Sequence, residues 1–271
     1  MLFTLILALI SFFRYGIGAD YFAYEFLYSR LSDSLITEIK YGLDNQELGF
    51  KIMGSISRSM GIPYQSYLAI IAAINLFYIY KMSVKYSKNP TLAMFLYFSM
   101  FYLVWTFSGL RQGLTIAIGL YYLLKCIKEN KPYKIVLISI ALAFIDYTAL
   151  VLILLYFISN INFKKNHLIL LTVISVIFSI LPLGFIFNYI PIPFITEKLG
   201  PYLQSGLSFN LIDFQSFSRI VLLIIMFVFY DWLVLDNYFN KRILNVYIIS
   251  MLFYFILQFT GELTAARLSR V

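Results

Sequence analysis

Seven of the eight arginines in this 271-residue chain stand at one set of ends of its hydrophobic segments. The planar guanidinium can hold phosphate oxygens through two parallel hydrogen bonds, which suits it to phosphorylated ligands. The arginines on this side are Arg14, Arg30, Arg58, Arg111, Arg219, Arg267 and Arg270. Their common side predicts a site for a phosphorylated substrate on one face of the molecule.

Three carboxylates could accept a proton beside such a site. Asp146 is a candidate because of its position inside an apolar stretch, and Asp20 and Glu47 because of their chemistry. A lone carboxylate in apolar surroundings is energetically expensive, so it usually faces a partner or a wet cavity. The structural alternative is that Asp146 merely pairs with Arg111 or Arg219.

The first of these arginines begins the segment Arg14-Tyr-Gly-Ile-Gly-Ala-Asp-Tyr21. Gly16 and Gly18 permit a tight backbone between a cation and the carboxylate of Asp20, and bare amides there could themselves face an anion. The alternative is a glycine-containing turn with an Arg14–Asp20 pair and an aromatic residue at the membrane interface.

A second motif, Leu110-Arg-Gln-Gly113, opens a hydrophobic segment. An arginine at a helix start lies beside the positive end of the helix dipole, and the two together concentrate positive potential for an anion. The alternative for Arg111 is an arginine that extends its charge to the membrane interface.

The sequence gives little support for a metal or a cofactor. His167 is the single histidine and lies far along the chain from Cys126, so a zinc site is implausible. The spacing of Asp20, Glu47 and Asp213 supports no other metal, and nucleotide-binding glycine fingerprints are absent. We expect neither a metal nor a cofactor.

The elements that position these residues must be membrane helices. The chain is 61% hydrophobic and only 13% charged, against about 25% charged in soluble domains. Its net charge of +8 is scattered between apolar segments, which indicates lipid headgroups and not nucleic acid as the partner.

Residues 1–13 lack a basic start and a small-residue cleavage site, so we expect no cleavable signal peptide. The predicted class is an all-α, polytopic integral membrane protein that forms one transmembrane domain over residues 1–271.

About seven spans are predicted by the apolar segments. They are residues 1–13, 63–81, 91–108, 112–127, 168–187, 219–235 and 243–260. Ten of the 13 lysines stand at the opposite set of ends from these arginines, which places their loops in the cytoplasm by the positive-inside rule. The arginine-bearing ends therefore face outward.

The apolar stretch at 135–160 has lysines before and after it. A single crossing would put one lysine cluster outside. We therefore prefer a re-entrant helical hairpin that turns around Asp146 and keeps both clusters inside; irregular backbone at that depth is tolerated where protein or a wet cavity surrounds it.

Two long outer loops follow from this topology. Residues 14–62 carry apolar residues at helical spacing, which predicts amphipathic helices at the interface. Residues 188–218 contain several prolines and glycines and are predicted to be a mobile loop.

Four motifs in order resemble the EpsG family of Wzy-type polysaccharide polymerases, over about Phe13 to Arg267. They are Arg-x-Gly-x-Gly-x-Asp-Tyr from Arg14, Glu-x-Gly-Phe from Glu47, Leu-Arg-Gln from Leu110, and an Ala-Phe stretch at 143–149 after a lysine-rich loop. The resemblance implies a multi-pass protein of the bacterial inner (cytoplasmic) membrane, with an active site that faces the periplasmic or extracytoplasmic side. It also implies undecaprenyl-diphosphate-linked oligosaccharides as donor and acceptor, and a flippase and a chain-length regulator as partners.

The resemblance extends to particular residues. It carries over Arg14, Tyr21, Arg111, Gln112 and Arg267. In our own interpretation Arg14, Arg111, Arg219 and Arg267 would hold the diphosphate, and Tyr21 and Gln112 would contact the substrate. Where the family pattern has histidine, this chain has Asp146, so the site would be impaired if histidine contacts the diphosphate. Members also usually continue with further membrane segments beyond the Arg267 motif, and the first span is short.

The expected activity is an inverting, metal-independent glycosyl transfer between two lipid-linked saccharides. A transporter or flippase of the same lipid is the main alternative. It would need charge at mid-depth in several spans, and apart from Asp146 they carry almost none. An acyltransferase would normally require a histidine on the outer side, where the sequence places none.

Overall fold

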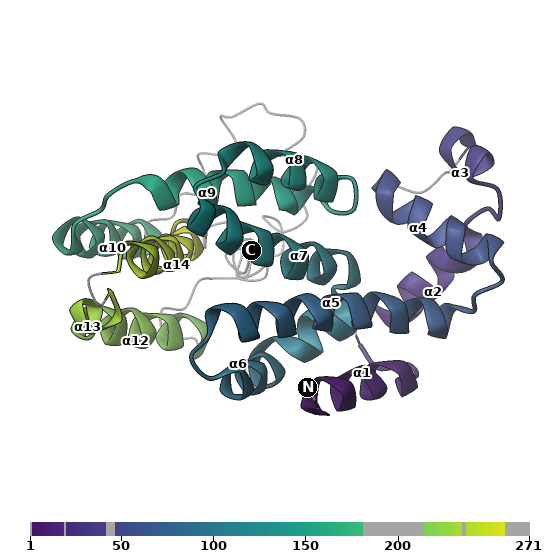
Figure 1. Cartoon of the computed structure of the whole chain (residues 1–271), viewed down its shortest axis with the longest axis horizontal. Helices are drawn as coiled ribbons and strands as arrows, with labels where there is room; N and C mark the ends of the chain where they lie inside the picture. Colours follow the sequence, from purple (N-terminus) through teal and green to yellow (C-terminus); the bar gives the residue numbers. More distant parts are fainter. Residues whose placement is uncertain (1, 19, 42–46, 181–213, 235–236, 258–271) are drawn as a thin grey trace. The chain divides into compact units, whose positions relative to one another are not determined.

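The computed structural model describes residues 2–18, 20–41, 47–180, 214–234 and 237–257, and within these ranges every regular element is a helix. The all-α prediction is therefore confirmed for the described residues. The chain divides into two compact units, Met1–Ile153 and Leu154–Val271, and we describe each by itself (Figure 1). The single transmembrane domain remains a prediction.

Unit 1 is built on the long helix α5 (Tyr64–Tyr86), which packs against α1 (Leu2–Phe13) and α7 (Leu110–Glu129). Between α5 and α7, helix α6 (Pro90–Tyr97) continues directly into a π-helix, η1 (Phe98–Ser108). One buried apolar cluster joins α1, α5, η1 and α7 through residues such as Leu7, Leu76 and Phe107. These contacts fix where the ends of α1 and η1 and the start of α7 lie.

Two helical segments of the described residues are long and apolar enough to cross a bilayer, namely α5 and the continuous α6–η1 segment Pro90–Ser108. Shorter apolar helices include α1 and Lys165–Ile177. Each predicted span is helical over its described residues, except that the span at 219–235 is interrupted at Phe229 and falls on two helices, Phe214–Val228 and Tyr230–Val234. The number of crossings stays a prediction.

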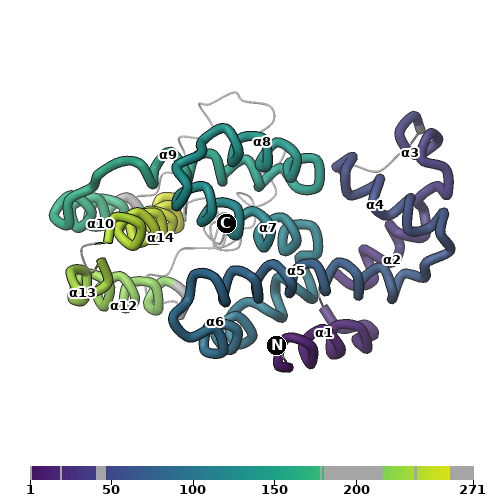
Figure 2. The backbone as a smooth tube through the Cα atoms, viewed as in Figure 1, coloured from purple at the N-terminus to yellow at the C-terminus, as the bar shows by residue number. Residues whose placement is uncertain are grey.

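The apolar stretch at 135–160 is broken as the hairpin prediction requires. Helix α8 (Pro132–Ala143) ends three residues before Asp146, and the chain resumes as η2 (Tyr147–Leu150) and α9 (Val151–Asn160). Because η2 packs back against α8, the chain turns between α8 and the start of α9 (Figure 2). An uninterrupted helix is excluded here, whereas the side of the membrane that the turn faces remains a prediction.

The first predicted outer loop forms three helices, α2 (Tyr21–Arg30), α3 (Leu35–Tyr41) and α4 (Leu48–Ser59). Tyr28 of α2, Leu31 directly after α2 and Phe50 of α4 are buried in one cluster with residues of α5. The apolar spacing of this loop therefore serves a core, although Ile56 of α4 is exposed.

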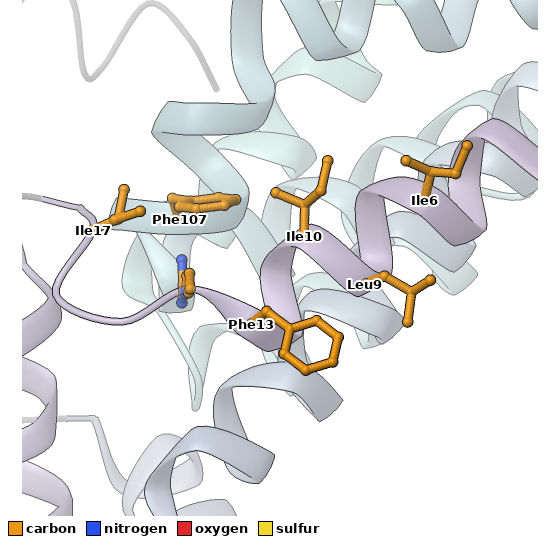
Figure 3. A pocket seen from close by; sticks show the side chains of 7 residues that line it. Ile6, Leu9, Ile10, Phe13, Ile17 and Phe107 are labelled. Atoms are coloured by element: carbon orange, nitrogen blue, oxygen red, sulfur yellow. The ribbon is translucent and has the colours of Figure 1, made fainter.

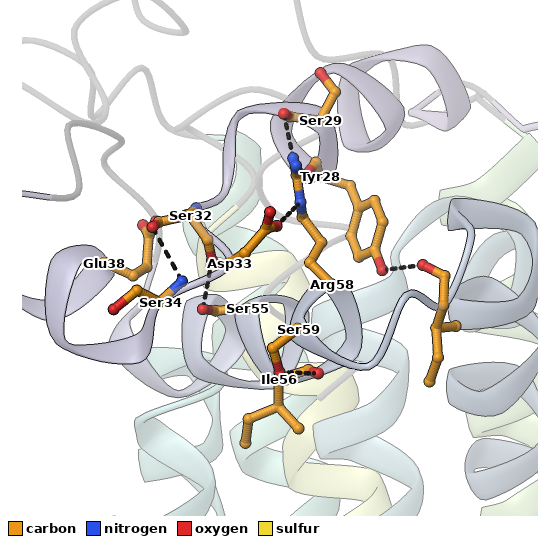
Figure 4. A network of polar contacts seen from close by, with 11 residues as sticks. Tyr28, Ser29, Ser32, Asp33, Ser34, Glu38, Ser55, Ile56, Arg58 and Ser59 are labelled. Carbon is orange, nitrogen blue, oxygen red and sulfur yellow. Dashed lines mark hydrogen bonds and ion pairs between the residues drawn. The ribbon is translucent and has the colours of Figure 1, made fainter.

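Polar contacts hold these three helices together (Figure 4). The Arg58 guanidinium donates to Asp33 Oδ1 at 2.8 Å and to the Tyr28 carbonyl at 3.2 Å. The buried carboxylate of Glu38 accepts from the Ser32 amide at 2.8 Å. Their interfacial location is a prediction.

Unit 2 contains α10 (Lys165–Ile180), α12 (Phe214–Val228), α13 (Tyr230–Val234) and α14 (Tyr238–Leu257). Helix α10 packs on α14 around a core that includes Leu168, Ile248 and Phe255. The buried Arg242 donates to the Ser159 carbonyl at 3.2 Å. The predicted mobile loop at 188–218 lies outside the described residues as far as residue 213.

Candidate functional site

Arg111 stands in the first turn of α7, where the sequence predicted a concentrated positive potential. Its guanidinium forms an ion pair with the Glu47 carboxylate, at the start of α4. Its Nε donates a long hydrogen bond of 3.4 Å to the Tyr24 hydroxyl, and its guanidinium carbon lies 5.8 Å from the centre of the Phe50 ring. The Arg111 side chain remains 27% exposed and that of Glu47 13%, so solvent or a ligand can still reach the pair.

Gly49 joins this ion pair to the turn that contains Asp146. Its amide donates to the Phe144 carbonyl at 2.6 Å. A Cβ atom at position 49 would lie only 2.6 Å from that carbonyl oxygen, so no larger residue fits without separating the two segments. The Glu-x-Gly-Phe motif therefore supplies an ion-pair partner, a close approach and a packing ring.

Asp146 lies near enough to Arg111 and Tyr24 to interact with both electrostatically. Its Oδ1 accepts from the Thr148 amide at 2.9 Å and from the Thr148 hydroxyl at 2.6 Å, which caps η2. Among the described residues no hydrogen bond reaches its Oδ2. We call Tyr24, Glu47, Arg111 and Asp146 the Arg111 cluster.

Tyr24 connects this cluster to the first motif, because Asp20 also lies within electrostatic range of it. Burial raises the pKa of the Tyr24 phenol above its usual value, and the nearby Arg111 only partly opposes this shift. The phenol is therefore neutral at physiological pH. While its oxygen accepts from Arg111, its proton is available to a substrate oxygen.

A close contact between α7 and η1 fixes the position of the first turn of α7, which carries Arg111. A Cβ atom at Gly113 would lie 1.9 Å from the Trp105 carbonyl oxygen of η1. The buried Asn75 amide donates to the Gly113 carbonyl at 2.7 Å, and its oxygen accepts from Tyr97 at 2.8 Å. These residues were not predicted from the sequence, although a buried asparagine inside the predicted span at 63–81 was an available signal.

Arg14 occupies different surroundings, just after α1. It is 3% exposed, its guanidinium donates to the Thr106 carbonyl at 3.0 Å, and it lies 4.7 Å from the centre of the Phe107 ring. Stacking of this kind contributes up to about 2 kcal/mol when it is shielded from water. The Arg14 Nε is buried without a hydrogen-bond partner.

The expected alternative of an Arg14–Asp20 pair is wrong: within the described part of the chain no carboxylate lies at ion-pair distance from Arg14. The intervening glycines instead shape the turn, because Gly16 and Gly18 have φ values of 64° and 114°. Gln65 of α5 holds this turn by donating to the Arg14 carbonyl.

Tyr21 and Gln112 have described contacts of their own. The Tyr21 ring is buried, and its hydroxyl donates to the Gln65 side chain at 3.0 Å. Gln112 is half-buried, and its carbonyl accepts from the Thr115 hydroxyl at 2.9 Å. Their predicted contacts with substrate remain predictions.

The other two predicted diphosphate ligands do not belong to unit 1. Arg219 lies in α12 of unit 2, with its guanidinium 3.8 Å from the centre of the Tyr254 ring. Arg267 and the predicted outer carboxylate Asp213 lie outside the described residues. The structure thus brings Arg111, Glu47 and Asp146 together, places Asp20 near them through Tyr24, and gives Arg14 a separate apolar environment.

Comparison with protein families gives a match over the whole chain. The family model of the EpsG family matches residues 1–271. No curated protein and no solved structure matches the chain. With the apolar helices described above, the match identifies a membrane protein of polysaccharide biosynthesis. The chain belongs to the EpsG family, a family of Wzy-like polysaccharide polymerases.

Proposed function

We propose that this protein polymerises undecaprenyl-diphosphate-linked oligosaccharide repeat units by an inverting, metal-independent glycosyl transfer. The observation that carries the proposal is the Arg111 cluster, in which a helix-start arginine, a neutral phenol and two carboxylates lie together. Family membership supports the polymerase class. The lipid, the stereochemistry and the roles of single residues are our inference.

In this mechanism Arg111 stabilises the leaving group. As the bond between the donor sugar and its diphosphate breaks, negative charge grows on the diphosphate oxygens. A guanidinium in the first turn of α7 adds its charge to the positive end of the helix dipole. Preorganised groups of this kind usually make the largest contribution to catalysis. In this proposal the Arg111 guanidinium and the helix dipole take the stabilising role that a divalent metal would otherwise have.

The Glu47 ion pair must partly open for this role. When no substrate is bound, Arg111 is held in place by Glu47. This pairing prevents a partly buried, uncompensated charge from destabilising the empty site. An arriving diphosphate carries more negative charge than one carboxylate and offers several oxygens to the guanidinium fork. We infer that the donor replaces Glu47 at part of the Arg111 fork.

Asp146 is the base that the geometry favours. Its Oδ1 is used by Thr148, which fixes the carboxylate, while no described residue donates to Oδ2. The acceptor hydroxyl would give its proton to Asp146 as its oxygen bonds to the anomeric carbon of the donor. The bond from that carbon to the diphosphate breaks, and the configuration inverts. The Glu47 carboxylate is already paired with Arg111, and the described contact of Asp20 with the cluster is an electrostatic one with Tyr24. Both are therefore less suited than Asp146 to act as the base.

Arg111→Lys tests the role of Arg111. Lysine keeps the charge but loses the bidentate fork, and the loss of one or two charge-assisted hydrogen bonds should reduce polymerisation at least about a hundredfold. The assay is in vitro polymerisation from purified lipid-linked repeat units, with and without a chelator. Arg58→Lys is the matched control, since Arg58 also pairs with a carboxylate, Asp33. Near-normal polymer from Arg111→Lys would overturn the role of Arg111, and loss of activity on chelation would overturn metal independence.

The proposed location is the bacterial inner membrane, with the Arg111 cluster facing the periplasmic or extracytoplasmic side. A flippase would then deliver the donor and acceptor, and a chain-length regulator would act on the product. Asn130 ends α7 and Lys165 begins α10, and the hairpin topology predicts that both face the cytoplasm. Cysteines placed at 130 and 165 should therefore be labelled from the same side by an impermeant reagent. Labelling from opposite sides would exclude the re-entrant hairpin.

A further inference from the structure

A pocket of about 400 Å³ lies where α1 ends and η1 ends, within the usual range of about 300–1,000 Å³ for ligand sites. Its lining is formed by Ile6, Leu9, Ile10, Phe13, Arg14, Ile17 and Phe107. Figure 3 shows the apolar side chains of α1 in a row, with Ile17 and Phe107 near its end. Arg14 is the only polar residue among them.

Arg14 is incompletely satisfied at this place. It is 3% exposed, its Nε has no hydrogen-bond partner, and no described carboxylate pairs with it. On the pocket side, Arg14 donates to the Thr106 carbonyl and lies over the Phe107 ring. A buried cation with a free donor beside an apolar pocket is energetically unfavourable unless an anion joins it.

We propose that this pocket binds the lipid end of the substrate, with the first isoprene units along α1 and the lipid-side phosphate on Arg14. The inference rests on the proposed function, because it assumes a lipid-linked donor or acceptor. It adds a subsite for the carrier chain that is separate from the Arg111 cluster.

The chemistry of the lining selects this type of lipid. The anion and the hydrocarbon must be directly joined, because Arg14 is flanked by Phe13, Ile17 and Phe107 with no polar side chain between. A polyprenyl phosphate has this form. A phospholipid has ester groups between its phosphate and its acyl chains, and those oxygens would enter the pocket without partners. Free pyrophosphate would gain the cation but leave the apolar lining empty.

Photo-labelling of the full-length protein in nanodiscs tests the proposal. The probe is a sugar-free polyprenyl diphosphate with a photoreactive group in its second isoprene unit, and the labelled peptides are identified by mass spectrometry. Label should appear within residues 6–17. Undecaprenyl phosphate should compete at least tenfold better than phosphatidylglycerol or pyrophosphate. Equal competition by either of these, or label confined to segments that do not line the pocket, would overturn the proposal.

Variants of α1 provide the matched comparison. Ile10→Trp fills the pocket and should reduce labelling at least tenfold. Leu5→Trp adds the same side chain at another exposed position of α1 that does not line the pocket, and it should label normally. Ile17 lies outside the helix, so Ile17→Trp provides a second test in case Ile10→Trp folds poorly. It should also reduce labelling at least tenfold. Normal labelling of both pocket variants would overturn the proposal.

The polymerase proposal and the lipid subsite can fail separately. Labelling uses a probe without sugar, so it can succeed in a protein that polymerises nothing. Conversely, if the protein polymerises undecaprenyl-linked units while the pocket variants polymerise and label like Leu5→Trp, the lipid subsite is wrong and the polymerase assignment stands.

Discussion

Arg14 and Arg111 belong to two sequence motifs that look equivalent, yet their surroundings differ in charge balance. Arg111 has Glu47 as an ion-pair partner and Asp146 within electrostatic range. Arg14 has a carbonyl, an aromatic face and an unsatisfied Nε in an apolar pocket. One guanidinium is balanced by carboxylates, whereas the described surroundings of the other contain no counter-charge.

Under the proposed function, this difference corresponds to two kinds of phosphate recognition. A balanced arginine can exchange its carboxylate partner for a developing charge, so its contribution can grow during the reaction. The lipid-side phosphate proposed for Arg14 is not bonded to the carbon that reacts, so Arg14 would contribute mainly to binding, and the apolar walls add affinity for hydrocarbon. Arg111 therefore fits the bond that breaks, and Arg14 fits the part of the lipid that does not react.

Gly113→Ala should have the largest effect, because it disturbs both arginines together. The added Cβ would lie 1.9 Å from the Trp105 carbonyl. It would push α7, which carries Arg111, away from η1, which holds Arg14 through Thr106. We expect loss of polymerisation and a destabilisation of about 3 kcal/mol or more, measured by thermal unfolding in detergent.

Gly119→Ala is the matched control within the same helix. A Cβ there would lie 2.4 Å from Leu152 Cδ1, the end of a side chain that can change rotamer, so the effect should be much smaller. Equal effects of the two substitutions would show that the contact between α7 and η1 has no special role in joining the two arginine sites.

Tyr24→Phe should have an intermediate effect that is specific to the Arg111 cluster. The substitution keeps the ring near Phe50 and removes the hydroxyl that accepts from Arg111. The loss of one hydrogen bond to a charged group is worth about 1.5–3 kcal/mol, so polymerisation should fall about tenfold or more. Photo-labelling of the Arg14 pocket should not change. A parallel loss of labelling would show that the two regions are not independent.

Sequence reasoning predicted which residues matter better than how they are arranged. The helical class, the break around Asp146 and the helix start at Arg111 follow from composition, periodicity and local signals. The Arg111–Glu47 pair links segments far apart in sequence, and only tertiary packing brings them together. The Arg14 pocket was missed because Asp20, six residues away, suggested a local pair, whereas the turn at Gly16 and Gly18 has no Arg14–Asp20 pair.

The π-helix η1 shows why the remaining arrangement was not predictable. Its eleven residues, Phe98–Ser108, are as apolar as an ordinary membrane helix, and nothing in their types requires wider winding. The polar contacts of Asn75, Tyr97 and Thr106 and the close approach of Gly113 surround its end. These contacts come from three other elements, and π-helical segments of this kind often occur near functional sites.

Asp146→His should have the smallest effect and sharpens the comparison most. A carboxylate repels a nearby diphosphate. An imidazole can take the proton of the acceptor-sugar hydroxyl and can also donate a hydrogen bond to the diphosphate. At an effective dielectric of about 20, one unit-charge repulsion at roughly 4 Å is worth about 4 kcal/mol, around a thousandfold in rate or affinity. Arg111 lies within electrostatic range of Asp146 and offsets most of this repulsion. We therefore expect polymerisation equal to, or modestly greater than, that of the chain with Asp146.

Asp146→Asn and Asp146→Ala complete this test in the same in vitro polymerisation assay. Asparagine can keep the cap on Thr148 that Asp146 Oδ1 makes while it removes the base, so it separates capping from catalysis. We expect both variants to fall well below Asp146→His. If Asp146→His instead abolishes polymerisation while the unaltered chain is active, the carboxylate itself is required. Repulsion of the diphosphate by Asp146 would then be unimportant, and the balance of charge around Arg111 would need Asp146 as well as Glu47.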